Sequence, residues 1–202
     1  MKKMKTVFVI DRDGGNTATT VPVASSEWVL NGEGVATIKR DGTSCMVRDG
    51  KLFKRLDRKL SKEFASKFRR DPEMVLEDHM FKGADKGWEA CESAPDKKTG
   101  HWPGWIPVGD SDPASQYHVE AFLRPGKLED GTYELVGPKI QSNKYSLDHH
   151  VLMRHGSEVV EVERSFGALK AWIETHDVEG LVFHHPDGRM AKLRRKDFNL
   201  HW

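Results

Sequence analysis

Short apolar runs with interspersed polar positions cover much of the chain, and Asp-Gly pairs stand beside several of them. Asp-Gly between β-like runs is a strong local signal for a β-hairpin. The pattern therefore predicts a fold dominated by antiparallel sheet, with a further strand at residues 6–10. The pairs are Asp49-Gly50 between residues 45–48 and 51–54, Asp130-Gly131 before residues 132–136, and Asp187-Gly188 between residues 181–184 and 190–194.

Helical periodicity begins after Ser165, a residue type that often caps the start of a helix. The stripe that follows consists of Phe166, Leu169, Trp172 and Ile173 and ends near His176.

Two other segments are harder to classify. Leu60, Phe64 and Phe68 are spaced for one face of a second helix, whereas residues 117–123 resemble a strand. Residues 71–117 lack a clear period, which predicts a long loop or an insertion.

Length and composition agree with one substantial core. The chain has 202 residues, of which 37% are hydrophobic and 31% charged, so we expect a single domain over residues 1–202. Asp11 interrupts the apolar run at residues 6–10 too early for a signal peptide or a membrane span. Cys45 and Cys91 are too few for a disulfide framework or a four-cysteine zinc site. We therefore expect a cytoplasmic monomer without membrane contact.

Charge is balanced over the whole chain but not along it. The formal net charge is +1, yet residues 51–70 contain nine basic residues and only two acidic ones. Such a stripe can follow a nucleic-acid backbone, although a solvated helical face explains it equally well.

The segment from Ala36 to Cys45 reads ATIKRDGTSC and places Lys39 between an apolar run and a turn. A lysine amine attacks phosphorus only when it is unprotonated, which requires desolvation or nearby positive charge. Lys-x-Asp-Gly alone does not distinguish such a nucleophile from a lysine that merely flanks a turn.

Three further charged positions strengthen the nucleophile interpretation. Lys192 and Arg194 lie two residues apart in a predicted strand, so they share one face, where two cations suit a phosphate. Glu179 precedes the apolar run at residues 181–183, where a carboxylate could hold Mg²⁺ or Mn²⁺. Glu134 faces away from its apolar neighbours in another strand.

This ordered set resembles the motifs of the covalent nucleotidyltransferase superfamily of ATP-dependent ligases and mRNA capping enzymes. Residues 39–42 resemble the nucleophile motif of that superfamily, and residues 132–136, 179–183 and 192–194 resemble its third, fourth and fifth motifs. The fifth motif departs from the usual Lys-x-Lys because Arg194 occupies its second cationic position. Arginine can hold a phosphate oxygen but cannot shuttle a proton.

A closer resemblance covers most of the chain. The sequence is similar to small single-domain RNA ligases of bacteria and phages, which are similar to the vertebrate 5′-to-3′ RNA ligase. This resemblance implies an α+β nucleotidyltransferase (ligase adenylation) domain of antiparallel β-sheets flanked by helices, without a C-terminal OB-fold. The matching runs are residues 27–30, 32–37, 55–59, 99–105 and 131–139.

The resemblance implies an ATP-dependent RNA ligase that joins 5′-phosphate and 3′-hydroxyl ends through a lysyl-AMP on Lys39, with Mg²⁺ or Mn²⁺. Lys192 and Arg194 would assist catalysis and bind ATP, and Glu179 and Glu134 would contact metal or nucleotide. The other expected nucleotide contacts are Ile38, Arg55, Glu120 and Tyr133, with Phe122 as an alternative aromatic partner for adenine.

RNA would be held by the basic stripe, through Arg58, Lys59, Lys62 and Arg69. Two rival functions use the same residues differently. A capping-type guanylyltransferase would use the same lysine with GTP, and a non-catalytic RNA-binding module would form no covalent adduct.

Overall fold

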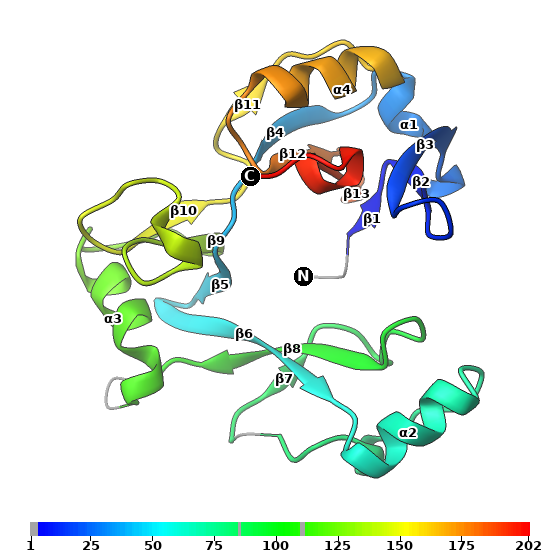
Figure 1. Ribbon diagram of the computed structural model, residues 1–202. Coiled ribbons are helices and arrows are strands. Elements are labelled where there is room, and N and C mark those ends of the chain that lie inside the picture. Colours follow the sequence, from blue (N-terminus) through cyan, green and yellow to red (C-terminus); the bar gives the residue numbers. More distant parts are fainter. Residues whose placement is uncertain (1–3, 85, 110–111) are drawn as a thin grey trace. The chain divides into compact units, whose positions relative to one another are not determined.

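The computed structural model describes residues 4–84, 86–109 and 112–202 (Figure 1). The chain forms two compact units. The middle unit comprises Gly42–Met153, and the terminal unit comprises Met4–Asp41 with Arg154–Trp202. Both contain antiparallel strands and helices, which confirms the predicted α+β class. The single domain and the missing OB-fold stay predictions.

A five-stranded sheet forms the framework of the terminal unit, in the order β1–β13–β12–β4–β11. Neighbouring strands are antiparallel except for the parallel pair β1 and β13. The strands are β1 (Lys5–Thr6), β4 (Val35–Lys39), β11 (Val159–Val160), β12 (Gly180–His184) and β13 (Met190–Arg194). A separate hairpin joins β2 (Phe8–Asp11) to β3 (Thr17–Pro22).

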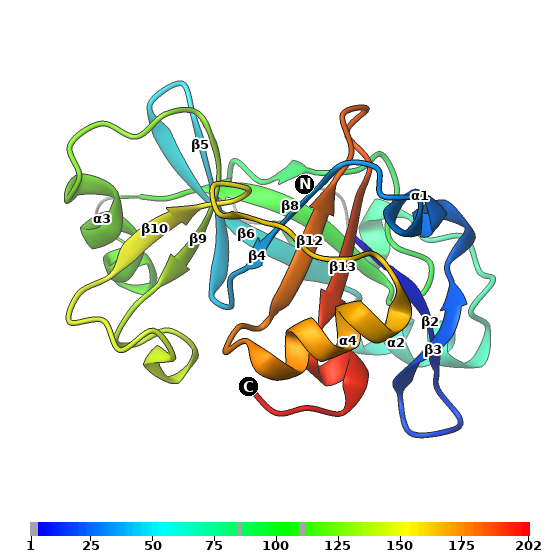
Figure 2. The same ribbon diagram turned by 90° about the horizontal axis from the view of Figure 1, so that it is seen from above.

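Helices cover one face of this sheet. In Figures 1 and 2, α4 (Phe166–Thr175) lies across β12 and β13, and α1 (Glu27–Leu30) lies at one end of the unit. Leu169 and Ile173 of α4 are fully buried with Leu181, Phe183 and Leu193 of the sheet. Each such buried side chain stabilises the fold by about 1.5–3 kcal/mol. Because side chains alternate along a strand, the residues between them point to the opposite face, which can carry polar groups.

The middle unit contains a six-stranded sheet in the order β10–β9–β5–β6–β8–β7. Its core includes Cys45, Leu52, Tyr133 and Leu135, against which α3 places Ala121. The elements are β5 (Thr43–Arg48), β6 (Lys51–Lys59), α2 (Lys62–Arg70), β7 (Glu89–Ala90), β8 (His101–Pro107), α3 (Gln116–Leu123), β9 (Gly131–Val136) and β10 (Val151–Arg154).

Both complete hairpins expected from Asp-Gly pairs are confirmed. Arg48 pairs with Lys51 in the β5–β6 hairpin, and His184 pairs with Met190 in the β12–β13 hairpin. Helix α4 also begins and ends as predicted. At its start, the Ser165 hydroxyl accepts a hydrogen bond from the Ala168 amide at 3.2 Å.

The predictions for residues 60, 71–117 and 117–123 need correction. Residues 117–123 belong to α3 instead of a strand, because Tyr117 and Ala121, four residues apart, pack on the same core. Helix α2 begins at Lys62, so Leu60 precedes it. Residues 101–107 of the expected loop form β8, which pairs with β6; residues 85, 110 and 111 lie outside the described part.

The strand expected at residues 6–10 is divided between β1 and β2, with Val7 buried between them. No helix in the described ranges is long and apolar enough to cross a membrane.

Candidate active site

The polar face of the terminal-unit sheet brings together three of the predicted residues. Lys39 ends β4, and the sheet register pairs both Lys39 and Arg194 with Gly180 of β12. Lys192 pairs with Val182, the next residue of β12 on the same face. Because Leu193 points into the core, Lys39, Lys192 and Arg194 all lie on the face opposite to α4.

Gly180 has a steric reason to be glycine. A Cβ at this position would lie 2.0 Å from the carbonyl oxygen of Leu193, which no side chain allows. Glycine therefore lets β12 approach β13 closely, and it leaves no side chain between Lys39 and Arg194.

Glu179, directly before β12, forms an ion pair with the ammonium group of Lys39. Each of the two side chains is 18% exposed, so the pair is largely shielded from water. Lys39 Nζ also donates a hydrogen bond to the carbonyl oxygen of Arg40 at 3.3 Å. These contacts fix the amine at the end of β4.

Glu179 is also the residue of this face that fits a divalent cation. Mg²⁺ is commonly held by one or two carboxylates together with substrate phosphates and water. No group of three or more His, Cys, Asp or Glu among the described residues could form a complete metal site. The donor set therefore fits a cation that arrives with phosphate better than a metal bound by protein alone.

Lys192 lies in the most strongly perturbed environment of the site. Burial first, and then the positive charges of Arg194 and Lys39, lower its pKa to about 8, whereas Asp197 and Glu179 oppose the shift. Arg194 is oriented by Asp197, whose Oδ1 accepts from Nη2 at 2.7 Å and whose Oδ2 accepts from Nε at 3.2 Å. The face thus presents two cations beside an amine, an arrangement suited to a polyphosphate.

In the middle unit, Glu134 and Arg55 share the face of the sheet opposite to its core. Glu134 pairs with Ser44 across β9 and β5, and Arg55 alternates with the core-facing Lys54. The Gly42 amide donates to Glu134 Oε1 at 3.1 Å. A Cβ on Gly42 would lie 2.1 Å from the Leu135 carbonyl oxygen, so packing requires glycine at this position.

Arg55 is held in place by its neighbours. Its guanidinium donates to Asp57 and to Cys91 Sγ and lies 5.6 Å from the ring centre of Trp105. The expectation that Arg55 contacts nucleotide stays a prediction.

The structure places three other predicted nucleotide contacts against the hydrophobic cores. Tyr133 is only 3% exposed on the core side, and its hydroxyl donates to the Glu129 carbonyl oxygen, so it cannot stack on adenine. Phe122 packs against the same core. Ile38 is partly buried against the core of the terminal unit, and its contact with nucleotide stays a prediction.

Glu120 lies on α3 instead of a strand, and its carboxylate is engaged by His150. Its Oε1 accepts from the His150 amide at 3.1 Å, and its Oε2 lies 2.7 Å from His150 Nδ1. Tyr117 stacks on the same imidazole with ring centres 4.3 Å apart. The carboxylate therefore ties α3 to residue 150, and a role at the ribose stays untested.

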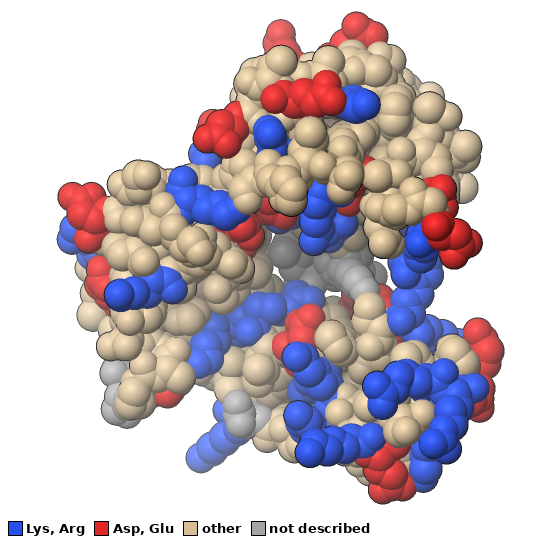
Figure 3. All heavy atoms as spheres, viewed as in Figure 1, with Lys and Arg blue, Asp and Glu red and all other residues tan. Residues whose placement is uncertain are grey.

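The basic stripe is divided by burial. Figure 3 shows Lys and Arg side chains gathered over the surface formed by α2, whose basic residues include Lys62, Lys67, Arg69 and Arg70. Lys59, Lys62 and Arg69 are exposed. The Arg58 side chain, in contrast, is only 6% exposed, so the expectation that it contacts RNA is not supported.

Arg58 instead contacts residues from three segments of the middle unit, namely 78–82, 88 and 102. Its guanidinium donates to Asp78 Oδ1 at 2.6 Å and to the Lys82 carbonyl oxygen at 3.1 Å. The rings of Phe81, Trp88 and Trp102 surround it, with centroids 5.0–5.8 Å away. Arg58 is therefore a structural residue of the middle unit.

Replacement of Arg58 by glutamine is expected to lower the free energy of unfolding by about 2–3 kcal/mol. The change removes a desolvated cation–π cluster and leaves the Lys82 carbonyl without its donor. Chemical denaturation measures the loss, and Lys59→Gln, an exposed neighbour, should change stability by less than about 0.5 kcal/mol. Equal effects of the two changes would contradict the structural role.

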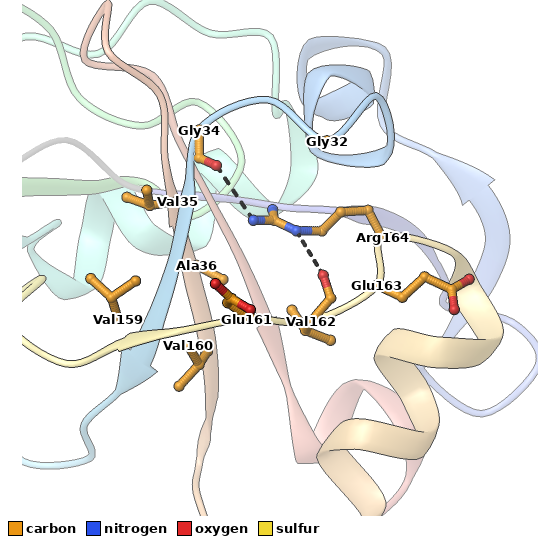
Figure 4. A pocket seen from close by; sticks show the side chains of 10 residues that line it. All are labelled: Gly32, Gly34, Val35, Ala36, Val159, Val160, Glu161, Val162, Glu163 and Arg164. Atoms are coloured by element: carbon orange, nitrogen blue, oxygen red, sulfur yellow. Dashed lines mark hydrogen bonds between the residues drawn. The ribbon is translucent and has the colours of Figure 1, made fainter.

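A separate hollow of 410 Å³ lies beside β4 and β11 (Figure 4). Arg164 forms part of its wall and donates to the carbonyl oxygens of Gly34 and Val162 at 3.4 and 3.2 Å. None of the predicted site residues lines this hollow. The residues that do are Gly32, Gly34, Val35, Ala36, Val159, Val160, Glu161, Val162, Glu163 and Arg164.

Sequence reasoning overlooked two residues of the polar face. Asp197 lies three residues after Arg194, a spacing that can join an acidic and a basic residue across one helical turn. Gly180 was read only as part of a motif. The i,i+3 spacing was a detectable signal for Asp197, whereas the close approach that requires glycine at position 180 depends on the sheet register.

Comparisons with known proteins identify a family with similar sequences. The family model described as RNA ligase 1 matches residues 120–202. RNA ligase 1 of Rattus norvegicus is 30% identical over 225 residues, which cover 83% of this chain and 68% of the rat protein. RNA ligase 1 of Mus musculus gives the same values, and that of Danio rerio is 28% identical with the same coverage.

Proposed function

The chain belongs to the RNA ligase 1 family, and from this premise we propose that it is an ATP-dependent RNA ligase acting through an adenylated lysine. The observation that carries the proposal is the polar face of the terminal-unit sheet. There Lys39 is paired with Glu179 on the face that also carries Lys192 and Arg194. A nucleophilic amine beside two phosphate-binding cations is what nucleotidyl transfer requires.

In the proposed first step, Lys39 Nζ attacks the α-phosphate of ATP. An N–P bond forms, the bond from the α-phosphorus to the bridging oxygen breaks, and pyrophosphate leaves with the electron pair. The ammonium group, which Glu179 contacts, releases its proton to water before attack, so the carboxylate of Glu179 stays ionised and can hold a cation. Lys192 and Arg194 would hold phosphate oxygens as negative charge shifts to the leaving group.

A divalent cation held by Glu179 and the phosphates would neutralise further charge when bound. In the remaining steps, AMP moves from Lys39 to an RNA 5′-phosphate, and an RNA 3′-hydroxyl then displaces AMP. Both steps need alignment more than new protein chemistry, so the same polar face can serve all three.

The test is covalent labelling. Protein incubated with ATP labelled at the α-phosphate and Mg²⁺ or Mn²⁺ is expected to retain label through denaturing electrophoresis, whereas labelled GTP gives none. Label from GTP alone would favour a capping-type guanylyltransferase. Label from neither nucleotide, in folded protein shown by mass to be unadenylated, would favour a non-catalytic RNA-binding module.

We also propose that the exposed basic residues of α2 bind the RNA backbone. Lys62 and Arg69 make no ion pair with any residue in the described ranges, so their charge is available to phosphate. The same does not hold for Lys67, which pairs with Glu63 at 2.6 Å.

The double change Lys62→Glu and Arg69→Glu is expected to weaken binding of single-stranded RNA by at least about tenfold. It should also reduce the slope of log affinity against log salt by about 1.4, since each lost phosphate contact contributes about 0.7. Fluorescence anisotropy over a salt series measures both quantities. Self-adenylation should persist, because neither residue belongs to the polar face that carries Lys39.

Lys170→Glu provides a charge-reversal control, because Lys170 is an exposed helical lysine on α4 in the other unit, 3.7 Å from the Glu174 carboxylate. It changes charge by the same amount per site. An equal loss of RNA affinity per reversed charge would show that total charge, and not α2, determines binding.

A further inference from the structure

Asp197 has an unusual position for a carboxylate. It is 2% exposed and lies in the short 3₁₀-helix Arg195–Phe198 that follows β13. Its carboxylate accepts three hydrogen bonds, all from Arg194: from the backbone amide at 2.9 Å, from Nε at 3.2 Å and from Nη2 at 2.7 Å. The cost of burying a carboxylate is offset only when the carboxylate is paired and accepts hydrogen bonds, and here Arg194 supplies both.

The pairing determines which edge of the guanidinium remains available. Asp197 occupies the edge formed by Nε and one N–H of Nη2. Arginine has five N–H groups in a rigid plane, so the second edge, formed by Nη1 and the other N–H of Nη2, still matches two oxygens of a phosphate. Within the described chain, no residue accepts a hydrogen bond from Nη1 of Arg194.

The pairing also fixes the guanidinium group in one orientation. A free arginine side chain loses rotamer entropy when a ligand holds it in one orientation. Here that orientation is fixed before any ligand binds, on a strand whose neighbouring Leu193 is fully buried. The second phosphate-binding cation is thus preorganised by contacts within β13 and the turn after it.

We propose that Asp197 is a positioning residue for nucleotidyl transfer: it orients the free edge of Arg194 toward the α-phosphate and the leaving pyrophosphate. This inference rests on the proposed function. It assigns to Asp197 no contact with substrate. Because Asp197 also favours the ammonium form of Lys192, the rates are compared at about pH 6, well below the Lys192 pKa of about 8, where the remaining effect passes through Arg194.

The experiment measures the rate constant of self-adenylation at saturating ATP and the ATP concentration that gives half of that rate. Asp197→Asn, nearly isosteric, is expected to lower the rate constant about 10- to 100-fold, since a misplaced catalytic group costs up to about 100-fold. The half-saturating ATP concentration should change less than threefold, because Lys192 still binds the phosphates. A loss of folded protein alone would lower the amplitude of labelling and not its rate constant.

A double-mutant cycle tests the route of the effect. In an Arg194→Gln background, Asp197→Asn should lower the rate constant by less than threefold further. Multiplicative losses would overturn the proposal, as would a wild-type rate in Asp197→Asn. Glu174→Gln, an exposed carboxylate on α4, should behave as wild type.

If Asp197→Asn fails to fold, Asp197→Glu replaces it in the cycle, because it keeps the charge but displaces the carboxylate by one methylene. Wild-type protein that forms no lysyl-adenylate would overturn the proposed function itself. Normal labelling of wild type together with an unaffected Asp197 variant would overturn only the role of Asp197.

Discussion

Replacement of Lys39 by alanine is expected to abolish covalent labelling by ATP, a loss of at least about a thousandfold. The amine nitrogen is the only protein atom that forms a bond to the α-phosphorus in the proposed first step. Without it, no residual pathway should form the adduct. Denaturing electrophoresis with α-labelled ATP measures the loss, and mass spectrometry of the wild-type protein should locate one AMP on Lys39.

Lys39→Arg separates nucleophilicity from charge. Arginine can keep an ion pair with Glu179 but remains protonated, so this variant should be as inactive as Lys39→Ala. Both variants should still join RNA that is supplied with AMP already on its 5′-phosphate, because that step does not use the lysine. Label retained by Lys39→Ala at another residue would contradict the assignment.

The local patterns that proved reliable are those set by neighbours in sequence. Asp49-Gly50 joins β5 to β6, and residues 186–188 join β12 to β13, because turn chemistry depends on two or three residues. The Ser165 cap and the stripe of α4 likewise follow from the chain alone. Alternation along β13 correctly placed Lys192 and Arg194 opposite the core.

The patterns that failed are those settled by distant contacts. Residues 117–123 are rich in residues that favour strands, yet tertiary packing on the middle-unit core makes them helical. Arg58 belongs to a basic run, but three aromatic rings from residues 81, 88 and 102 bury it. No local signal distinguishes such an arginine from an exposed one.

The surroundings of Lys39 were predicted in part, because they combine a local pattern with a distant contact. The apolar run before it does form a strand, but β4 and β5 belong to different sheets, so Asp41-Gly42 is not the turn of a hairpin. If Lys39 only flanks a turn, as the alternative interpretation has it, that turn does not belong to a hairpin between β4 and β5. Its ion pair with Glu179, 140 residues away, was not predicted, because no spacing in the sequence indicates it.

Lys192 is expected to give the second largest effect, and one that depends on pH. Lys192→Ala should lower the rate constant of self-adenylation divided by the half-saturating ATP concentration about 100- to 1000-fold at pH 7, as expected for loss of a cationic stabiliser. In the wild type, that ratio should also fall as pH rises through about 8, because the lowered pKa of Lys192 removes its positive charge there.

The direction of this pH dependence follows from the charged groups around Lys192. Burial, Arg194 and Lys39 favour its neutral form, whereas Asp197 and Glu179 favour the ammonium form. Below about pH 8 the charge is present and phosphate binding is supported; above it, the charge is lost although an unperturbed lysine would keep it to beyond pH 10. The pH dependence of the rate constant divided by the half-saturating ATP concentration reports ionisations of the free enzyme, so it gives the pKa of Lys192 before ATP binds.

Lys192→Arg is the decisive control, because arginine keeps its charge over the whole range. Its activity at pH 7 should exceed that of Lys192→Ala, and the decline near pH 8 should disappear. Stopped reactions with α-labelled ATP from pH 6 to pH 10 measure both features. A decline that persists unchanged in Lys192→Arg would assign the titration to another group and remove Lys192 from the role of phosphate-binding cation.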